Sequence, residues 1–171
     1  MHNLILLLTG IDNAVQNKFA WDRRRYITEE KYQKLKRYTL FPNDVVITIM
    51  ATTGRSAVIP ENIPLSINTK HLAAITLDLH KANPYFISYS IHSDPRIVDQ
   101  IIGKNRGAIM PGLNLGIIKD LEFTLPPIEL QNKFADILRK TEELKLKMIA
   151  QLEELDKQFQ ALMQKSLGNK V

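Results

Sequence analysis

Cysteine is absent from this sequence of 171 residues, which excludes a disulfide scaffold and a thiolate zinc site and is typical of a reducing cytoplasm. Long apolar runs are absent too, since no stretch approaches the roughly 18 residues of a membrane-spanning helix. The apolar run at residues 4–8 is too short for the core of a signal peptide, and no basic residue precedes it. We therefore expect a soluble cytoplasmic protein without a membrane partner.

The common sequence patterns of enzymes are also missing. There is no P-loop and no G-x-S-x-G elbow, and Gly103, Gly107 and Gly112 are too widely spaced for a dinucleotide-binding loop. The four histidines show no i, i+4 pairing and no glutamate at a ligand-like offset. An adenine methyltransferase would need an Asn/Asp-Pro-Pro-aromatic box, but the double proline here is flanked by Leu125 and Ile128. We expect no catalytic residue, no metal and no cofactor.

The composition is that of a folded protein, with 44% hydrophobic and 24% charged residues and a net charge of +5. The charge is unevenly distributed. Residues 1–125 contain 15 basic and 11 acidic residues, whereas residues 126–171 contain 8 and 7. The basic excess lies in the first part, where it weakly favours an anionic partner.

The double proline at residues 126 and 127 divides the chain, because it cannot lie inside a helix and holds the preceding residue extended. We predict one domain over residues 1–125 and a second segment over residues 126–171. After the prolines there is no glycine or proline until Gly168, so about 40 residues of good helix formers follow. A continuous helix of that length spans roughly 60 Å.

This predicted helix carries a seam of apolar or small residues at alternating steps of three and four, with one stutter between Met148 and Leu152. Such a seam indicates a coiled coil with a partner helix. The alternative is one long helix packed along its own domain. The seam consists of Leu130, Phe134, Ile137, Thr141, Leu144, Met148, Leu152, Leu155, Phe159 and Leu162.

The first 125 residues are predicted to mix strands and helices. Short runs rich in Val, Ile and Leu predict strands at residues 4–8, 45–50, 57–59, 72–77 and 121–125. Helices are expected at residues 29–37 with Thr28 as N-cap, at 84–92 with Pro84 in first position, and at 95–102. The fold class is therefore α+β: a compact mixed α/β domain followed by one long C-terminal coiled-coil helix.

Four basic segments are candidates for contact with phosphates or base edges. Arg23, Arg24 and Arg25 are bracketed by aromatic residues, and arginine can donate two hydrogen bonds to a phosphate or to guanine. A solvated loop with a half-buried Trp21 is an equal alternative. The basic residues of the helix after Thr28 are spread around its surface, which favours a solvated face.

The other two segments are turns. Thr52-Thr53-Gly54-Arg55 ends a predicted strand, and its glycine permits close approach of the backbone to a ligand, although ordinary hairpins have the same pattern. Lys104-Asn105-Arg106-Gly107 forms a polar loop whose charge is also consistent with simple solvation. Together the four segments favour a nucleic-acid surface over a small-molecule pocket.

Two longer segments have recognisable family patterns. Residues 41–55, FPNDVVITIMATTGR, resemble a "GD-hydrophobic … G-x-x-G-R" pattern in which Asn43 and Ala51 replace the usual glycines. Residues 66–72, SINTKHL, resemble an "x-I-N-Q-H-L" strand entry, and Pro84-Tyr85-Phe86 resembles the start of the helix that follows it.

The most specific pattern closes the domain. Residues 113–131 resemble an "L-N … L-P-x-P-L-P-P-L-x-x-Q" signature that leads directly into a long helix. From about Gly10 to Leu167 the chain is similar to the specificity subunits of type I restriction–modification systems. Those subunits usually carry two target-recognition domains and two such helices, so this chain resembles a half-size form. The resemblance also implies a recognition domain shortened at its N-terminus.

The resemblance implies a non-catalytic subunit that reads one half of a bipartite site in double-stranded DNA. It would dock the methyltransferase (modification) subunit, and through it the restriction subunit, and would pair with a second copy through the helix. The alternative is a truncated, DNA-inactive module that dimerises and only occupies the modification subunit. The expected DNA-binding residues are Arg23, Arg24, Arg25, Thr53, Arg55, Lys70, Lys104 and Arg106.

Overall fold

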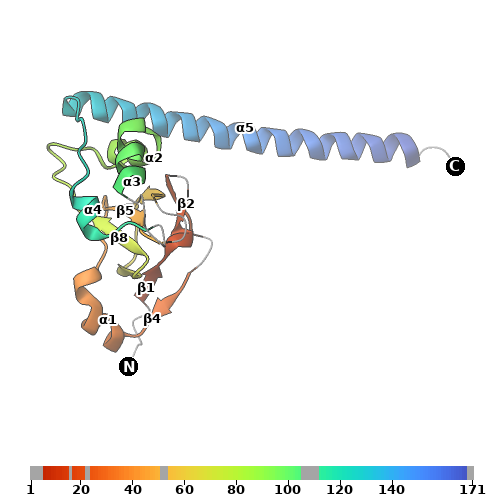
Figure 1. Ribbon diagram of the computed structural model, residues 1–171. Helices are drawn as coiled ribbons and strands as arrows, with labels where there is room; N and C mark the ends of the chain where they lie inside the picture. The colour runs from red at the N-terminus through yellow and green to blue at the C-terminus, as the bar shows by residue number, and fades with distance from the viewer. Residues whose placement is uncertain (1–5, 16, 22–23, 51–53, 105–111, 169–171) are drawn as a thin grey trace. The chain divides into compact units, whose positions relative to one another are not determined.

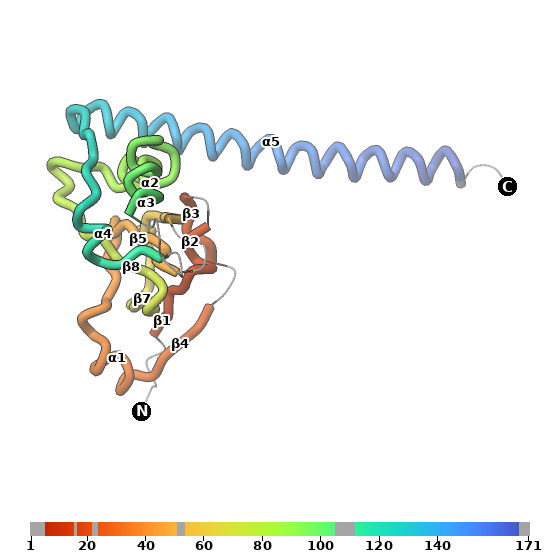
Figure 2. The backbone as a smooth tube through the Cα atoms, viewed as in Figure 1, coloured from red at the N-terminus to blue at the C-terminus, as the bar shows by residue number. Residues whose placement is uncertain are grey.

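The structure is a computed structural model that describes residues 6–15, 17–21, 24–50, 54–104 and 112–168 (Figure 1). It contains two compact units, of which the first ends at Asn132 and the second begins at Lys133. The described strands and helices α1 to α4 all belong to the first unit, and the second consists of the remainder of one long helix (Figure 2). None of the helices in the described ranges is long and apolar enough to cross a membrane.

One sheet has the strand order β4-β1-β7. The central strand β1 (Leu6–Thr9) is antiparallel to β4 (Tyr26–Ile27) and parallel to β7 (Ser66–Asn68). One face of this sheet buries a small cluster that consists of Leu6, Ile27, Tyr32 and Ile67. Strands β4 and β7 are only two and three residues long, so neither has the alternation that reveals a strand in a sequence.

The second sheet has the order β6-β5-β8, and both outer strands are antiparallel to the central one. Its strands are β5 (Val45–Thr48), β6 (Ser56–Val58) and β8 (Leu72–Ile75). Every residue of β5 is buried, because its alternate side chains enter two different clusters on opposite faces. The larger cluster includes Val45, Ile47, Ala73, Ala82, Ile87, Ile91, Ile97, Ile101, Leu113 and Leu121.

A third pairing, between β2 (Ala14–Val15) and β3 (Lys18–Phe19), forms a hairpin around Asn17, whose φ is +64°. The turn before β5 uses a second asparagine with positive φ, Asn43 at +68°. Asparagine tolerates this left-handed conformation better than most residues do. Asn43 is therefore suited to the position at which the family pattern usually has glycine.

The predicted helices are confirmed within a few residues. Helix α1 (Glu29–Leu35) starts at Thr28, whose Oγ1 accepts the Lys31 backbone N–H at 3.4 Å, and a 3-10 turn (Lys36–Tyr38) follows it. Helix α2 (Pro84–Ser93) starts at Asn83, whose Oδ1 accepts the backbone N–H groups of residues 85 and 86.

Helix α3 (Pro95–Lys104) is two residues longer than expected, and a short helix that the sequence did not predict, α4 (Leu115–Lys119), follows. A 3-10 turn, η1 (Ile11–Asn13), lies directly after β1. These turns are too short to have a clear hydrophobic period.

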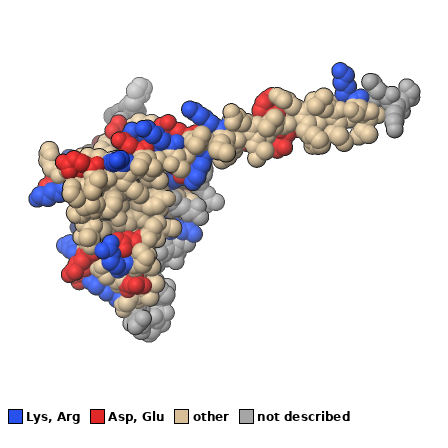
Figure 3. All heavy atoms as spheres, turned by 90° about the horizontal axis from the view of Figure 1, so that it is seen from above, with Lys and Arg blue, Asp and Glu red and all other residues tan. Residues whose placement is uncertain are grey.

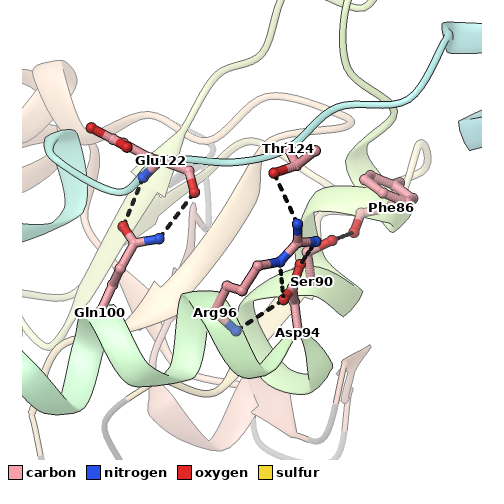
Figure 4. A network of polar contacts seen from close by, with 7 residues as sticks. All are labelled: Phe86, Ser90, Asp94, Arg96, Gln100, Glu122 and Thr124. Atoms are coloured by element: carbon pink, nitrogen blue, oxygen red, sulfur yellow. Dashed lines mark hydrogen bonds and ion pairs between the residues drawn. The ribbon is translucent and has the colours of Figure 1, made fainter.

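The predicted strand at residues 121–125 is wrong, because this segment has no strand pairing. A side chain takes the place of a neighbouring strand: Gln100 accepts the Glu122 N–H at 2.9 Å and donates to the Glu122 carbonyl at 3.1 Å (Figure 4). Arg96 also donates to Thr124 Oγ1 at 3.1 Å. The segment has no regular secondary structure, and helix α3 is its bonding partner.

Arg96 is itself held by Asp94, through a bidentate contact with distances of 3.1 and 2.8 Å (Figure 4). Hydrogen bonds from the Arg96 side chain and from its backbone N–H hold the pKa of the Asp94 carboxyl below its usual value. This network therefore connects the start of α3 to the segment that leads to the long helix.

The long helix α5 (Ile128–Gly168) has 41 residues and begins directly after the double proline, as predicted. Its first turns are anchored in the first unit by Gln131, which is completely buried. Gln131 Oε1 accepts the Asn83 N–H at 2.9 Å, and Nε2 donates to the carbonyls of Lys81 at 3.1 Å and Pro126 at 2.7 Å. The glutamine of the closing signature thus holds the double proline and the start of α2 together.

Candidate nucleic-acid interface

Strand pairing brings several candidate basic residues to one end of the first unit. In the first sheet, the end of β1 lies beside the start of β4, where Leu8 donates its N–H to the Arg25 carbonyl at 2.7 Å. On its other side Thr9 pairs with Asn68, so β1 and β7 end together. The chain then turns at residues 69–71 and enters β8.

The second sheet extends the same rim. Leu72, at the start of β8, pairs with Thr48 at the end of β5. Thr48 in turn donates its N–H to the Arg55 carbonyl at 2.8 Å, at the start of β6. The ends of β1, β5 and β7 and the starts of β4, β6 and β8 therefore form one continuous edge. We call the part of this edge that holds Arg24, Arg25, Arg55 and Lys70 the basic rim.

Arg55 is presented by a tightly bonded turn. Its backbone N–H donates to Thr48 Oγ1 at 3.0 Å, and Gly54 donates to the Thr48 carbonyl at 3.0 Å with φ of +83°. A residue with a Cβ is strained at that φ, which explains the glycine. The Arg55 side chain is exposed at the surface. Thr53, in the same predicted turn, lies outside the described residues.

Lys70 is exposed at the middle of the β7–β8 turn. The turn is fixed by Asn68, whose Nδ2 donates to the carbonyls of Thr69 at 3.1 Å and Leu72 at 2.7 Å. It is joined to the end of β5 by a hydrogen bond from the Ile49 N–H to the His71 carbonyl at 2.9 Å. The two turns that carry Arg55 and Lys70 are therefore direct neighbours, although 15 positions separate these residues in sequence.

The arginine cluster divides into different environments. The Arg24 guanidinium lies 5.6 Å from the centre of the half-buried Trp21 ring, which packs edge-on against Phe19. Arg25 forms an ion pair with Asp12. Arg24 and Arg25 therefore have different partners, although both side chains are exposed. Arg23 lies outside the described residues.

Lys104 is committed to a contact within the fold. As the last residue of α3 it donates to the Asp120 carbonyl at 3.2 Å and lies 3.4 Å from the Asp120 carboxylate. The same end of α3 borders the basic rim, because a Cβ on Gly54 would lie 4.0 Å from Cδ1 of Ile101. Arg106, the other candidate of this segment, lies outside the described residues.

The seam side chains of α5 are almost all open to solvent. Phe134 is half-buried, and the remaining large apolar members are between 56 and 64% exposed: Leu130, Ile137, Leu144, Met148, Leu152, Leu155, Phe159 and Leu162. Figure 3 shows uncharged atoms over much of the far half of this helix, with basic and acidic side chains between them. So many exposed leucine-type side chains in one row are uncommon on a surface without a partner.

The sequence did not predict the structural roles of two residues that organise this unit. Gln131 belongs to the closing family pattern, but its burial was not predicted, because a glutamine near the start of a helix is ordinarily exposed. Asp12 stood alone in the sequence, 13 positions from the arginine that it binds. Within the described ranges no group of three or more histidine, aspartate or glutamate side chains is arranged to hold a metal ion.

Comparison with known proteins shows what kind of chain this is. The family described as type I restriction modification DNA specificity domain matches residues 9–155. No curated protein matches the sequence. The fold resembles the crystal structure of the HsdS subunit from Thermoanaerobacter tengcongensis, with a TM-score of 0.70 and 19% identity over 96% of this chain and 43% of that chain.

A second solved structure, described as the structural basis underlying complex assembly and conformational transition of the type I R-M system, matches with a TM-score of 0.65. It is 19% identical over 96% of this chain and 43% of the other. The chain therefore spans less than half the length of the solved structures that it matches. Because the family pattern covers most of the chain and the fold agrees with it, this protein belongs to the type I restriction–modification DNA specificity domain family.

Proposed function

We propose that this chain is a DNA specificity subunit that reads one half of a bipartite site in double-stranded DNA. It is non-catalytic, acts in the cytoplasm and takes no cofactor of its own. It docks the modification subunit, which connects it to the restriction subunit, and it pairs with a second copy through α5. The observation that carries the DNA-reading part is the basic rim, where basic side chains from separate turns meet at one edge.

The rim is suited to DNA because its cations are presented on bonded turns. Arg55 and Lys70 are exposed, and the backbones that carry them are held by short hydrogen bonds to Thr48 and Asn68. A cation on a fixed backbone loses less conformational entropy when it binds a phosphate or a base edge. Arginine and lysine at such positions can contact phosphate oxygens or the O6 and N7 acceptors of guanine.

The opposite end of the first sheet provides a matched control surface. Helix α1 follows the end of β4, which pairs with the start of β1, so Lys31 and Lys36 lie away from the rim. Both lysines are exposed. Replacing them removes the same charge as a rim variant without a change at the proposed DNA surface.

The test compares two double variants, each in complex with a modification subunit, by fluorescence anisotropy on a selected duplex over a range of salt concentrations. Removal of Arg55 and Lys70 should weaken binding and reduce the slope of log K against log salt by about 2, since each phosphate contact contributes roughly 0.9. Removal of Lys31 and Lys36 should leave the slope close to that of the wild type. Equal effects of the two variants would contradict a DNA surface at the rim.

Self-pairing is supported by the exposed seam. One helix with a row of leucine-type residues at steps of three and four buries that row by packing against a second helix. A two-fold dimer is the simplest arrangement for one kind of chain. Such a dimer selects two inverted copies of one half-site at a spacing set by the pair of helices.

Docking of a further partner is supported by the width of the apolar stripe. Beyond the seam, Ile149, Met163 and Leu167 are between 41 and 66% exposed. At 100° per residue they lie on one flank of the seam, so the stripe is wider than the two-residue seam of a simple dimer. A helix pair covers the seam and leaves this flank for another helical element, which we assign to the modification subunit.

Light scattering of the purified chain at micromolar concentration tests the pairing. We expect a dimer alone, and a complex that selects a spaced inverted repeat from a DNA library once the modification subunit is added. A monomer would contradict pairing through α5. A dimer whose complex selects no sequence would instead identify a DNA-inactive assembly module.

A further inference from the structure

A carboxylate lies beside the basic rim, at a place where an acid weakens attraction to DNA. Asp12 belongs to η1, directly after β1, and its Oδ1 accepts a hydrogen bond from Nη2 of Arg25. The Arg25 side chain is 46% exposed and that of Asp12 is 24% exposed. The pair is therefore open to a ligand on the arginine side and more enclosed on the aspartate side.

The backbone beneath Asp12 is fixed by its neighbour. The buried Asn13 accepts the Gly10 N–H at 2.9 Å, and its Nδ2 donates to the Ala20 carbonyl at 2.8 Å. The Ala20 N–H returns a hydrogen bond to the Asn13 carbonyl at 2.9 Å. Asp12 thus projects from a turn that is bonded on both sides.

Arg25 also has a fixed backbone, since its carbonyl accepts the Leu8 N–H at 2.7 Å. Its guanidinium lies against Gly10, where an added Cβ would overlap Nη2 and lie 3.2 Å from Cζ. Gly10 has an extended backbone, with φ of −125°, which any residue adopts. The added Cβ would also lie 2.8 Å from Asp12 Oδ1, so a larger residue at this position would displace the ends of both side chains of the ion pair.

Stability alone is a poor explanation for this ion pair. Exposed ion pairs add little to folding. Asp12 Oδ2 is buried and has no hydrogen-bond partner within the described part of the chain. The desolvation of this oxygen lowers the free energy of unfolding and offsets the small gain from the ion pair.

We infer that Asp12 is a positioning residue that holds the Arg25 guanidinium in one orientation at the rim, so that the selectivity of DNA binding depends on Asp12 more than its overall strength does. The inference rests on the proposed DNA-reading function. Asp12 neutralises part of the attraction between Arg25 and any phosphate. The Arg25 N–H groups that Asp12 does not bind then point in a fixed direction. An oriented arginine can make the paired hydrogen bonds that distinguish guanine, which a mobile arginine makes at a higher entropic cost.

The test measures the ratio of affinities for a selected duplex and for an unrelated duplex, in complex with the modification subunit. Asp12→Asn should raise affinity for the unrelated duplex, because a negative charge is lost, and lower the ratio about tenfold. Gly10→Ala displaces the Arg25 guanidinium and the Asp12 carboxylate that holds it without a change of charge, so it should lower the ratio with an unchanged salt slope. Asp12→Glu should restore part of the selectivity.

If Asp12 acts only by repelling phosphate, Asp12→Asn raises both affinities equally and the ratio stays constant, which would overturn the inference. A ratio that Gly10→Ala leaves unchanged would overturn it as well. Urea denaturation followed by Trp21 fluorescence checks that both variants remain folded like the wild type. If the wild-type complex shows no sequence preference, both the proposed function and the inference fail. If the wild type prefers the selected duplex and the variants prefer it equally, the inference alone is refuted.

Discussion

Replacement of Gln131 by methionine tests whether the buried amide anchors α5 to the first unit. Methionine has a similar length and no hydrogen-bonding amide, so the change removes three hydrogen bonds, of 2.7, 2.9 and 3.1 Å. One N–H and two carbonyls lose their partner. A buried group left without a partner costs roughly 1–3 kcal/mol.

The expected loss is smaller than the sum of three such terms. The contacts of Gln131 are only partly buried, so water reaches some of the freed groups, and the methionine gains apolar burial. We expect the free energy of unfolding to fall by about 2–4 kcal/mol, a large share of the roughly 5–15 kcal/mol of a typical domain. With a urea m-value of about 2 kcal/mol per molar, the midpoint should fall by about 1–2 M.

Urea denaturation followed by the fluorescence of Trp21, the single tryptophan of the chain, measures this loss in the first unit. Gln164→Met is the matched control, because Gln164 is exposed on the same helix and faces away from the seam at 100° per residue. The control should change stability by less than about 0.5 kcal/mol. Equal midpoints for the two variants would refute the anchoring argument.

A carboxylate at the same position adds a pH test. In Gln131→Glu, the Asn83 N–H favours the ionised form, but burial and the carbonyls of Lys81 and Pro126 oppose it more strongly, so the pKa of the introduced carboxyl rises above the ordinary value of about 4.3. The variant is therefore least destabilised below about pH 4.3, where the carboxyl is protonated in both the folded and the unfolded state. It becomes less stable as pH rises through the raised pKa. Stability that does not depend on pH relative to the wild type would contradict the burial of this group.

Three further predictions concern other parts of the molecule. Arg55→Ala should weaken specific DNA binding by about 1–3 kcal/mol and relax the preference at one base position, as measured by binding to a panel of single-base variants; an unchanged panel would remove Arg55 from the interface. The double change Leu152→Lys and Leu155→Lys should convert a dimer to a monomer in light scattering while Trp21 fluorescence is unaffected, and a persisting dimer would place the contact elsewhere. The pKa of Asp94 is lowered mainly by the hydrogen bond from the Arg96 side chain. The contribution of this pair to the free energy of unfolding is therefore present above the unfolded pKa of about 3.9 and is lost as pH falls through the lowered pKa. Asp94→Asn should make the free energy of unfolding less dependent on pH in the acid range, and an unaltered dependence would show that the pair does not contribute.

Most elements of the fold follow from local sequence. The strand at β5 was predicted from a run of β-branched and aliphatic residues, and α5 from a long stretch of helix formers after a double proline. The segment at residues 121–125 was predicted to be a strand and is not, because its apolar run is also compatible with an extended chain bonded to a side chain. Gln100 supplies that bond, and it lies 22 positions away from Glu122 in the sequence.

The candidate site was only partly visible in the sequence. The basic residues were identified one segment at a time, each with an ordinary alternative, and nothing local showed that the turns of Arg55 and Lys70 adjoin. Lys104 had the same appearance in sequence as its neighbours, yet it is bound to Asp120. Whether a cation is available to a ligand depends on acids that are distant in sequence.

The sequence by itself determined the class of fold, the start of a long helix after the double proline, the length of α5 and its row of apolar residues, and the family pattern. These features are local or periodic, so the order of the residues is sufficient to specify them. Only the tertiary structure decided that six strand ends share one rim, that Asp12 holds Arg25, and that Gln131 is buried between Asn83 and Pro126. Each of these depends on strand register and on contacts between distant residues, which follow from the packing of the whole unit and leave no local mark in the chain.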